Sequence, residues 1–111
     1  MNNEVVGNYI RAHRRNRGLS QRELGILVGY EHGSAVGRHE RSESAPTLLV
    51  ALAYEIIFEA PISQLFTGFH SVVAQSIARN LVGLKTSLED DGNRRRANFE
   101  KTQWLLKQQI G

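Results

Sequence analysis

Apolar residues recur at helical spacing along the first third of the chain and predict two short helices. The first runs from about residue 4 to 17 and ends at Gly18; its inner face is formed by Val5, Val6, Tyr9, Ile10 and His13. The second begins with Ser20-Gln21-Arg22-Glu23, a capping box in which the serine hydroxyl and the glutamate carboxylate bind main-chain amides. It turns Leu24, Leu27 and Val28 inward and ends at Gly29.

Three further helices are predicted before residue 68. Tyr30-Glu31-His32-Gly33 has the composition of a turn, after which Ser34 caps a helix that extends to Arg41 and has Val36 as its apolar anchor. Pro61 restarts the chain later on, and a short closing helix with Ile62, Leu65 and Phe66 is ended by Thr67-Gly68. Between them Pro46 opens a strongly apolar helix, which we expect at the centre of the core with Leu48, Leu49, Leu52, Ala53, Ile56 and Ile57.

The last third of the chain carries a different pattern. One apolar stripe with spacings of four, four, three and four residues is formed by Val73, Ile77, Leu81, Leu84 and Leu88. The cluster Glu89-Asp90-Asp91-Gly92-Asn93 breaks it, and a second helix from Arg94 to Gln109 places Phe99, Gln103, Leu106 and Ile110 on one face, with Trp104 and Leu105 beside it.

We therefore expect residues 1–68 to form one domain and residues 69–111 a helical hairpin. The hairpin either packs within the monomer or dimerises, and the pattern supports both equally. The dimerisation candidates are Ile77, Leu81, Leu84, Leu88, Trp104 and Leu106.

Positive charge is concentrated at the two ends of the chain. Residues 1–41 contain seven arginines and four acidic residues, residues 42–92 two basic against six acidic residues, and residues 93–111 five basic residues against one acidic residue. Every basic residue of the first segment is arginine, which suits bidentate contacts with phosphate and guanine. A polyanion is therefore the expected partner, although an ordinary solvated helix face has the same composition. Arg94-Arg95-Arg96 is either a second DNA contact or a solvated helix start, and we favour the solvated start, because the first turn of a helix disfavours cations.

Composition and motifs argue against several other classes of protein. The absence of cysteine excludes disulfides and thiolate metal sites. The chain opens without a signal-peptide pattern, and its longest apolar run, residues 48–54, is far shorter than a membrane span, which predicts a cytoplasmic protein. We assign His13 and His39 to packing, while His32 and His70 have no paired ligands. No catalytic triad order, phosphate loop or Glu-x-x-His motif is present, so we expect no enzymatic activity, no metal and no cofactor.

The order of several residues carries a resemblance to a known family. Arg14, Gly18, Leu19-Ser20-Gln21, Leu24 and Glu40 occur together, and Pro46 and a leucine-rich stretch to Phe66 follow them. In this combination, residues 5–67 resemble the Cro/C1-type (XRE-family) helix-turn-helix domain. The resemblance implies an all-α protein with a five-helix, lambda-repressor-like helix-turn-helix domain, followed here by a C-terminal two-helix extension that the resemblance does not cover.

The resemblance also implies roles for particular residues. Arg14 and Glu40 match the charged pair that ties the first helix of the family to its recognition helix, here residues 34–41. Ser34, Ala35 and Arg38 match positions that meet base edges in the major groove or flanking phosphates. Arg38 is the best candidate for base readout, since a bidentate arginine–guanine contact discriminates by about 1–3 kcal/mol. The expected phosphate contacts are Arg11, Arg15, Arg17, Gln21, Arg22 and Arg41.

The sequence departs from the family pattern around the turn. The segment from Gly29 to Ser34 is one residue longer than usual, and Gly25 stands where alanine is common, at a cost of about 1 kcal/mol in helix propensity. Gly33 and Gly37 replace larger polar residues near the recognition surface. Arg38 and Arg41 consequently carry more of the expected specificity.

Two hypotheses on function follow. The first is a sequence-specific transcriptional regulator, a repressor, that binds double-stranded DNA as a homodimer. The second is an antitoxin-like or accessory protein-interaction module, whose C-terminal helices bind a protein partner. DNA binding through several phosphates should weaken steeply between about 50 and 200 mM salt, whereas the second hypothesis predicts a flat response.

Overall fold

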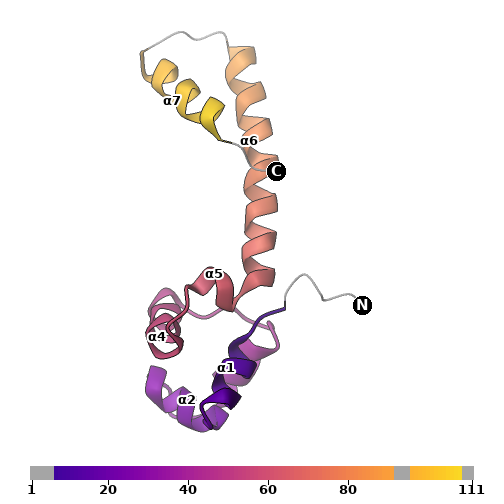
Figure 1. The fold of residues 1–111 in the computed structure, drawn as a ribbon. Helices are drawn as coiled ribbons and strands as arrows, with labels where there is room; N and C mark the ends of the chain where they lie inside the picture. Colours follow the sequence, from indigo (N-terminus) through magenta and orange to yellow (C-terminus); the bar gives the residue numbers. More distant parts are fainter. Residues whose placement is uncertain (1–6, 92–95, 109–111) are drawn as a thin grey trace. The chain divides into compact units, whose positions relative to one another are not determined.

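The computed structural model describes residues 7–91 and 96–108, and these form seven helices and no strand (Figure 1). The prediction of an all-α protein is confirmed. The chain divides into two compact units, residues 1–71 and 72–111. The helices are α1 (Ile10–Asn16), α2 (Gln21–Val28), α3 (Ser34–Glu40), α4 (Leu48–Phe58), α5 (Ile62–Leu65), α6 (Thr67–Asp91) and α7 (Arg96–Lys107).

The first unit closes around a single apolar core to which each of the helices α1 to α5 contributes (Figure 1). Burying a large apolar side chain contributes about 1.5–3 kcal/mol, so this cluster is the main source of stability of the unit. Its buried members are Ile10, Leu24, Val36, Val50, Tyr54, Phe58, Leu65 and Phe66.

Helix α1 begins later than the apolar pattern predicts. Residues 7–9 are not helical, and the Asn8 side-chain oxygen accepts a hydrogen bond from the main-chain amide of Ile10 at 3.0 Å. The Tyr9 amide donates to the Leu65 carbonyl at 2.8 Å, which ties this segment to α5 instead of to a helical turn. The expected start near residue 4 is therefore wrong for residues 7–9, and Val5 and Val6 lie outside the described residues.

Helix α2 has the start and the end that its sequence predicts. Ser20 Oγ accepts from the Glu23 amide at 3.0 Å, and the Glu23 carboxylate accepts from the Ser20 amide at 2.8 Å, so the capping box is confirmed. Gly29 follows with a φ of 107°, in the left-handed region that glycine adopts without strain. The prediction that Leu27 faces inward is wrong, because its side chain is 57% exposed.

Helix α4 presents a different face to the core from the one we expected. Its buried side chains are Val50, Tyr54 and Phe58, spaced four residues apart. The helix starts at Leu48 with Thr47 as its cap instead of at Pro46, and the two large aromatic rings bring more apolar surface into the core than leucine does. The expected core residues Leu48, Leu49, Leu52 and Ile56 are 73%, 77%, 45% and 78% exposed.

Two other helix boundaries differ from the prediction. The residue that caps α3 is Gly33, without a side-chain hydrogen bond, and Ser34 is the first helical residue. Thr67 does not end the closing helix; it begins α6, whose second residue, Gly68, donates its amide to the Gly7 carbonyl at 2.9 Å.

The second unit contains α6 from residue 72 onward and α7. Helix α6 is continuous through Asp91, so the acidic cluster does not break it before that residue. Residues 92–95, which include Gly92 and Asn93 of the expected turn and Arg94-Arg95, lie outside the described residues, as do Gln109 and Ile110 and the side chains of Arg96 and Phe99.

Candidate nucleic-acid interface

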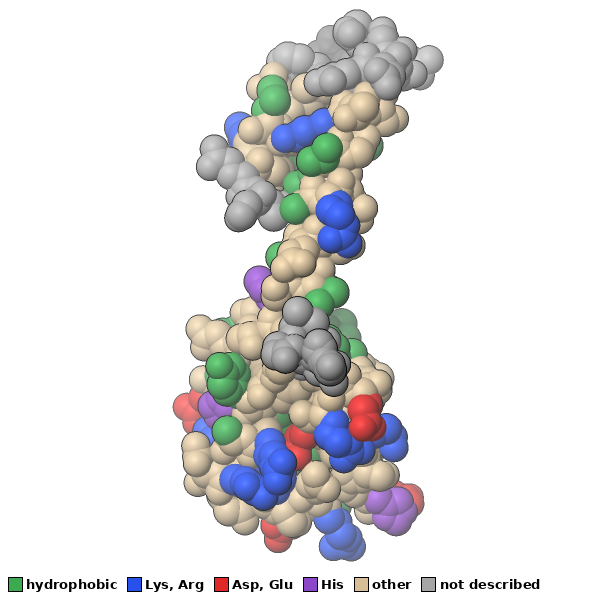
Figure 2. Space-filling model, turned by 90° about the vertical axis from the view of Figure 1, so that its right-hand side faces the viewer, with side chains coloured by type: hydrophobic (Ala, Val, Ile, Leu, Met, Phe, Trp, Pro, Cys, Tyr) green, Lys and Arg blue, Asp and Glu red, His purple; other side chains and the backbone are tan. Residues whose placement is uncertain are grey.

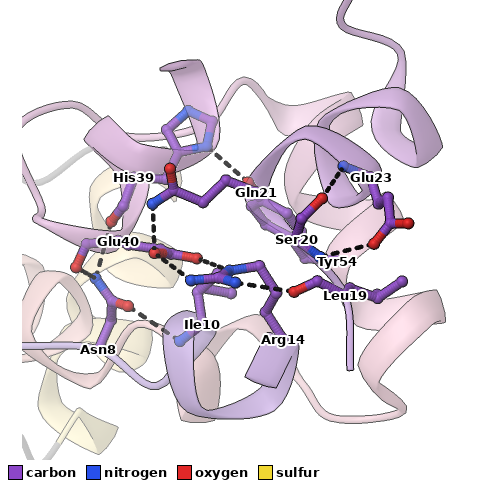
Figure 3. A network of polar contacts seen from close by, with 10 residues as sticks. All are labelled: Asn8, Ile10, Arg14, Leu19, Ser20, Gln21, Glu23, His39, Glu40 and Tyr54. Carbon is purple, nitrogen blue, oxygen red and sulfur yellow. Dashed lines mark hydrogen bonds and ion pairs between the residues drawn. The ribbon is translucent and has the colours of Figure 1, made fainter. Parts of the chain in front are cut away.

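Helices α2 and α3 are joined to α1 by a buried polar cluster centred on Glu40 (Figure 3). Arg14 donates from Nε and Nη2 to the two carboxylate oxygens of Glu40, at 2.5 and 3.3 Å. Gln21 Nε2 donates to Glu40 Oε1 at 3.1 Å, and Arg14 Nη1 donates to the Leu19 carbonyl at 2.8 Å. The last residue of α3 is thus fixed to α1, to the start of α2 and, through Arg14, to the segment between them.

Asn8 holds the C-terminal end of α3 from the other side. Its amide nitrogen donates to the carbonyls of His39 and Glu40 at 2.9 and 3.3 Å and to Ser42 Oγ at 2.8 Å. The carbonyls at a helix end have no partner within the helix, and here a single side chain satisfies two of them. Asn8 therefore fixes the end of α3 at the same time as the start of α1.

The inner face of α3 rests on an aromatic cluster that contains one titratable ring. His39 is buried, and its Nδ1 lies 2.8 Å from the Tyr54 hydroxyl in a buried hydrogen bond. Burial, and secondarily the charge of Arg38, lower the pKa of His39 below its usual value, while burial raises the pKa of Tyr54. Both rings are therefore neutral near pH 7 and serve packing, as we expected of His39.

The glycines near the turn allow α2 and the turn to α3 to approach closely. A Cβ atom on Gly25 would overlap the His32 carbonyl oxygen, and one on Gly33 would lie 2.7 Å from the Arg22 amide nitrogen. A Cβ on Gly37 would lie 3.4 Å from Gln21 Nε2, and Gly37 is buried. Gly33 thus lies against the start of α2, and Gly37 lies between the side chains of Gln21 and Arg41.

The outward face of α3 consists of Ser34, Arg38 and Arg41. These residues are exposed and follow one another at spacings of four and three, which places them on one side of a helix, opposite buried Val36. Arg41, directly after the helix, pairs with Glu43 at 2.7 Å, but both side chains are more than half exposed and such pairs are weak. Ala35 is partly buried beside this face.

The predicted phosphate contacts fall into two groups. Arg11 and Arg15 on α1 and Arg22 on α2 are exposed. Gln21 is only partly exposed and already donates to Glu40, so it holds the helices together. Arg17 is exposed but engaged elsewhere: its guanidinium lies 5.1 Å from the centre of the Phe58 ring and donates to the Phe58 carbonyl at 3.3 Å.

The start of α2 offers main-chain donors next to these arginines. The Glu23 amide donates to Ser20 Oγ, and the Leu24 amide donates to the Ser20 carbonyl. The amides of Gln21 and Arg22 are the other main-chain donors of the first turn. Such amides and the helix dipole attract anions. Basic side chains are prominent on the surface of the first unit, with a few acidic ones among them (Figure 2). The arrangement is suited to a phosphate backbone beside the outward face of α3.

Two residues that organise this site were missed in the sequence. Asn8 is a residue type that often precedes a helix, and that signal was available, but the apolar pattern of residues 5–10 outweighed it. Tyr54 carries no local signal, because its partner His39 is fifteen residues away in the chain.

No site of another kind stands out in the described residues. Among them, no group of three or more histidine or acidic side chains could hold a metal ion. None of the helices in the described ranges has the length and apolar character needed to cross a membrane.

No protein-family model matches the chain, and no curated protein sequence matches it. The geometry of α2 and α3 and the charge around them are therefore the grounds for a functional proposal.

Proposed function

We propose that this chain is a sequence-specific DNA-binding protein that represses transcription, built on a lambda-repressor-like helix-turn-helix arrangement of the XRE type. Helix α3 enters the major groove, where Ser34, Ala35 and Arg38 meet base edges. Arg11, Arg15, Arg22 and Arg41 lie along the phosphates, together with the first amides of α2.

One observation carries this proposal: the two sides of α3 have opposite roles. Its inner side is fixed by Glu40, His39 and Val36, whereas its outer side presents Arg38 and Ser34, whose side chains bind no other group in the part of the chain that the structure describes. A fixed helix with a free polar face and arginines around it is the form that base recognition requires, because the positions of the donors must be set before the DNA arrives.

The test is a comparison of two arginine variants on selected DNA. Sequences bound by the chain are first selected from random DNA, and affinities are then measured for the selected and a scrambled sequence. Arg38→Ala should lower the ratio of the two affinities by about 5- to 150-fold, which corresponds to the loss of about 1–3 kcal/mol of discrimination. Arg79→Ala on α6 is the matched control, since it removes another exposed arginine that lies outside the proposed interface. An unchanged ratio for Arg38→Ala excludes the base contact.

A second candidate function is that of an antitoxin-like or accessory module that binds a protein. The exposed leucines and isoleucine of α4 favour it, because large exposed apolar side chains in one place mark protein-binding surfaces. The salt response separates the two: steep weakening of DNA binding between about 50 and 200 mM salt supports the first function, and the absence of any DNA binding supports the second.

A further inference from the structure

The second unit buries very little of its own apolar surface. Among its residues with described side chains, 72–88 and 100–108, Leu105 is the only large apolar residue that is buried. The unit spans Val72–Gly111, about the 40-residue size below which a helical segment needs a metal, a disulfide or a partner to be stable. The chain has no cysteine, so a disulfide cannot stabilise the unit.

Helix α6 carries its apolar residues as one open stripe. Val73, Ile77 and Leu84 are 54%, 46% and 44% exposed, while Leu81 and Leu88 are partly buried. From Ile77 onward the spacing alternates four, three and four, which is the seam of a helix that packs against another along its length. Figure 2 shows green apolar side chains spread over the visible face of the second unit, with several blue basic ones among them.

Helix α7 extends the apolar surface in two directions. Trp104 and Leu106 are 56% and 65% exposed on either side of buried Leu105. At about 100° per residue, these three residues cover more than half of the helix circumference. One neighbouring helix covers a narrower arc, so α7 needs contacts with more than one.

The area of this surface fits a second copy of the chain. The five side chains Val73, Ile77, Leu84, Trp104 and Leu106, each about half exposed, amount to roughly 400 Å² of apolar surface on each copy. Two such surfaces with their polar neighbours bury about 1,000 Å² in total, the size at which specific interfaces begin.

Charge also permits self-association. Between Val72 and Leu88 the charged residues are Arg79 and Lys85, and neither belongs to the stripe. Two identical stripes therefore meet without like charges opposite one another, as a two-fold symmetric interface requires. The α6 stripe itself contains no cation, which makes it an unsuitable face for nucleic acid or an anionic membrane.

We propose that the second unit associates with the same unit of another copy, with the two α6 stripes at the centre and Trp104 and Leu106 at their flanks, to form a helical bundle. Each copy supplies the apolar cover that the other lacks. The proposal stands on the second unit alone and holds whether or not the first unit binds DNA.

The test is the mass of the full chain in solution, measured by sedimentation equilibrium over a range of concentrations. The chain should sediment at twice its mass of 12.5 kDa in the micromolar range. Ile77→Asp and Leu84→Asp should each raise the dissociation constant at least tenfold. Val82→Asp is the matched control, because Val82 is 65% exposed and lies about 140° around the helix from Ile77.

A second measurement keeps the test decisive if a variant loses helix. Trp104 is the only tryptophan of the chain, so its fluorescence should shift to shorter wavelength as the wild-type protein is concentrated, when the ring leaves water. A wild-type protein that is monomeric over the whole range from micromolar to millimolar concentration overturns the proposal. So does an equal loss of association in Val82→Asp and Ile77→Asp at unchanged circular dichroism.

Discussion

Removing the carboxylate of Glu40 should be among the most damaging single changes in the first unit. The side chains of Glu40 and Arg14 are 3% and 10% exposed, so their charges are almost fully removed from water. In Glu40→Ala, Arg14 loses the partner of Nε and Nη2 and keeps only the Leu19 carbonyl, and Gln21 Nε2 loses its acceptor as well.

The expected cost follows from that geometry. Removing one member of a buried ion pair costs about 3–5 kcal/mol, because the other charge stays buried without compensation. We expect the lower end of this range, since the Leu19 carbonyl still accepts from Arg14. Glu40→Gln, which keeps an oxygen near Arg14 and loses the charge, should cost about 1–3 kcal/mol.

The assay is urea unfolding followed by circular dichroism, with a double-mutant cycle. Arg14→Met, Glu40→Met and the double variant are compared, and the double variant should be clearly more stable than the sum of the single losses predicts. Glu43→Gln, which breaks the exposed pair with Arg41, is the control and should leave the urea midpoint unchanged. Two results would refute the claim that the buried pair joins α1 to α3. The first is a double variant whose loss of stability equals the sum of the two single losses, and the second is a Glu40→Ala variant that is as stable as Glu43→Gln.

Three further predictions concern the core, the turn and pH. Ile56→Gln, at a side chain that is 78% exposed, should change the free energy of unfolding by less than about 0.5 kcal/mol, whereas Leu65→Ala in the core should cost about 2–5 kcal/mol; equal urea midpoints would contradict the observed orientation of α4. Gly25→Ala should destabilise the protein by about 1–3 kcal/mol through overlap with the His32 carbonyl, while Gly83→Ala, which has open space around it, should raise the melting temperature through better helix propensity. Because the pKa of His39 is lowered in the folded protein, the unfolded chain binds the proton more readily, so stability should be full above the usual histidine pKa of about 6.5 and fall as the pH drops below it; His39→Asn should lack this slope in urea midpoints measured between pH 8 and 5.

Local signals in the sequence located the helices more reliably than their buried faces. The capping box and the glycines that end α1 and α2 act within a few residues, so they determine where a helix starts and stops whatever packs against it. Helix α4 shows the limit of such signals. It is apolar on nearly all sides, so periodicity does not distinguish Leu52 from Tyr54 as the inward residue.

The candidate site could be predicted only where a known family pattern supplied long-range information. Arg14 and Glu40 lie 26 residues apart in the chain, and no local rule pairs them; the resemblance did. The departures from the pattern were harder to interpret. Gly25 looked like a cost in helix propensity, yet a Cβ atom there would overlap the His32 carbonyl oxygen. Such a close approach depends on three-dimensional distance and leaves no signal in composition or spacing.

The separation of buried and exposed residues within α3 also affects how this protein can evolve. The residues that stabilise the helix, Val36, His39 and Glu40, alternate along the chain with those that face outward, Ser34 and Arg38. Mutations at the outward positions leave the buried network intact, so they alter the chemistry of the exposed surface at little risk to folding. New binding preferences are therefore accessible by single substitutions, and a library randomised at positions 34 and 38 should yield mostly folded members.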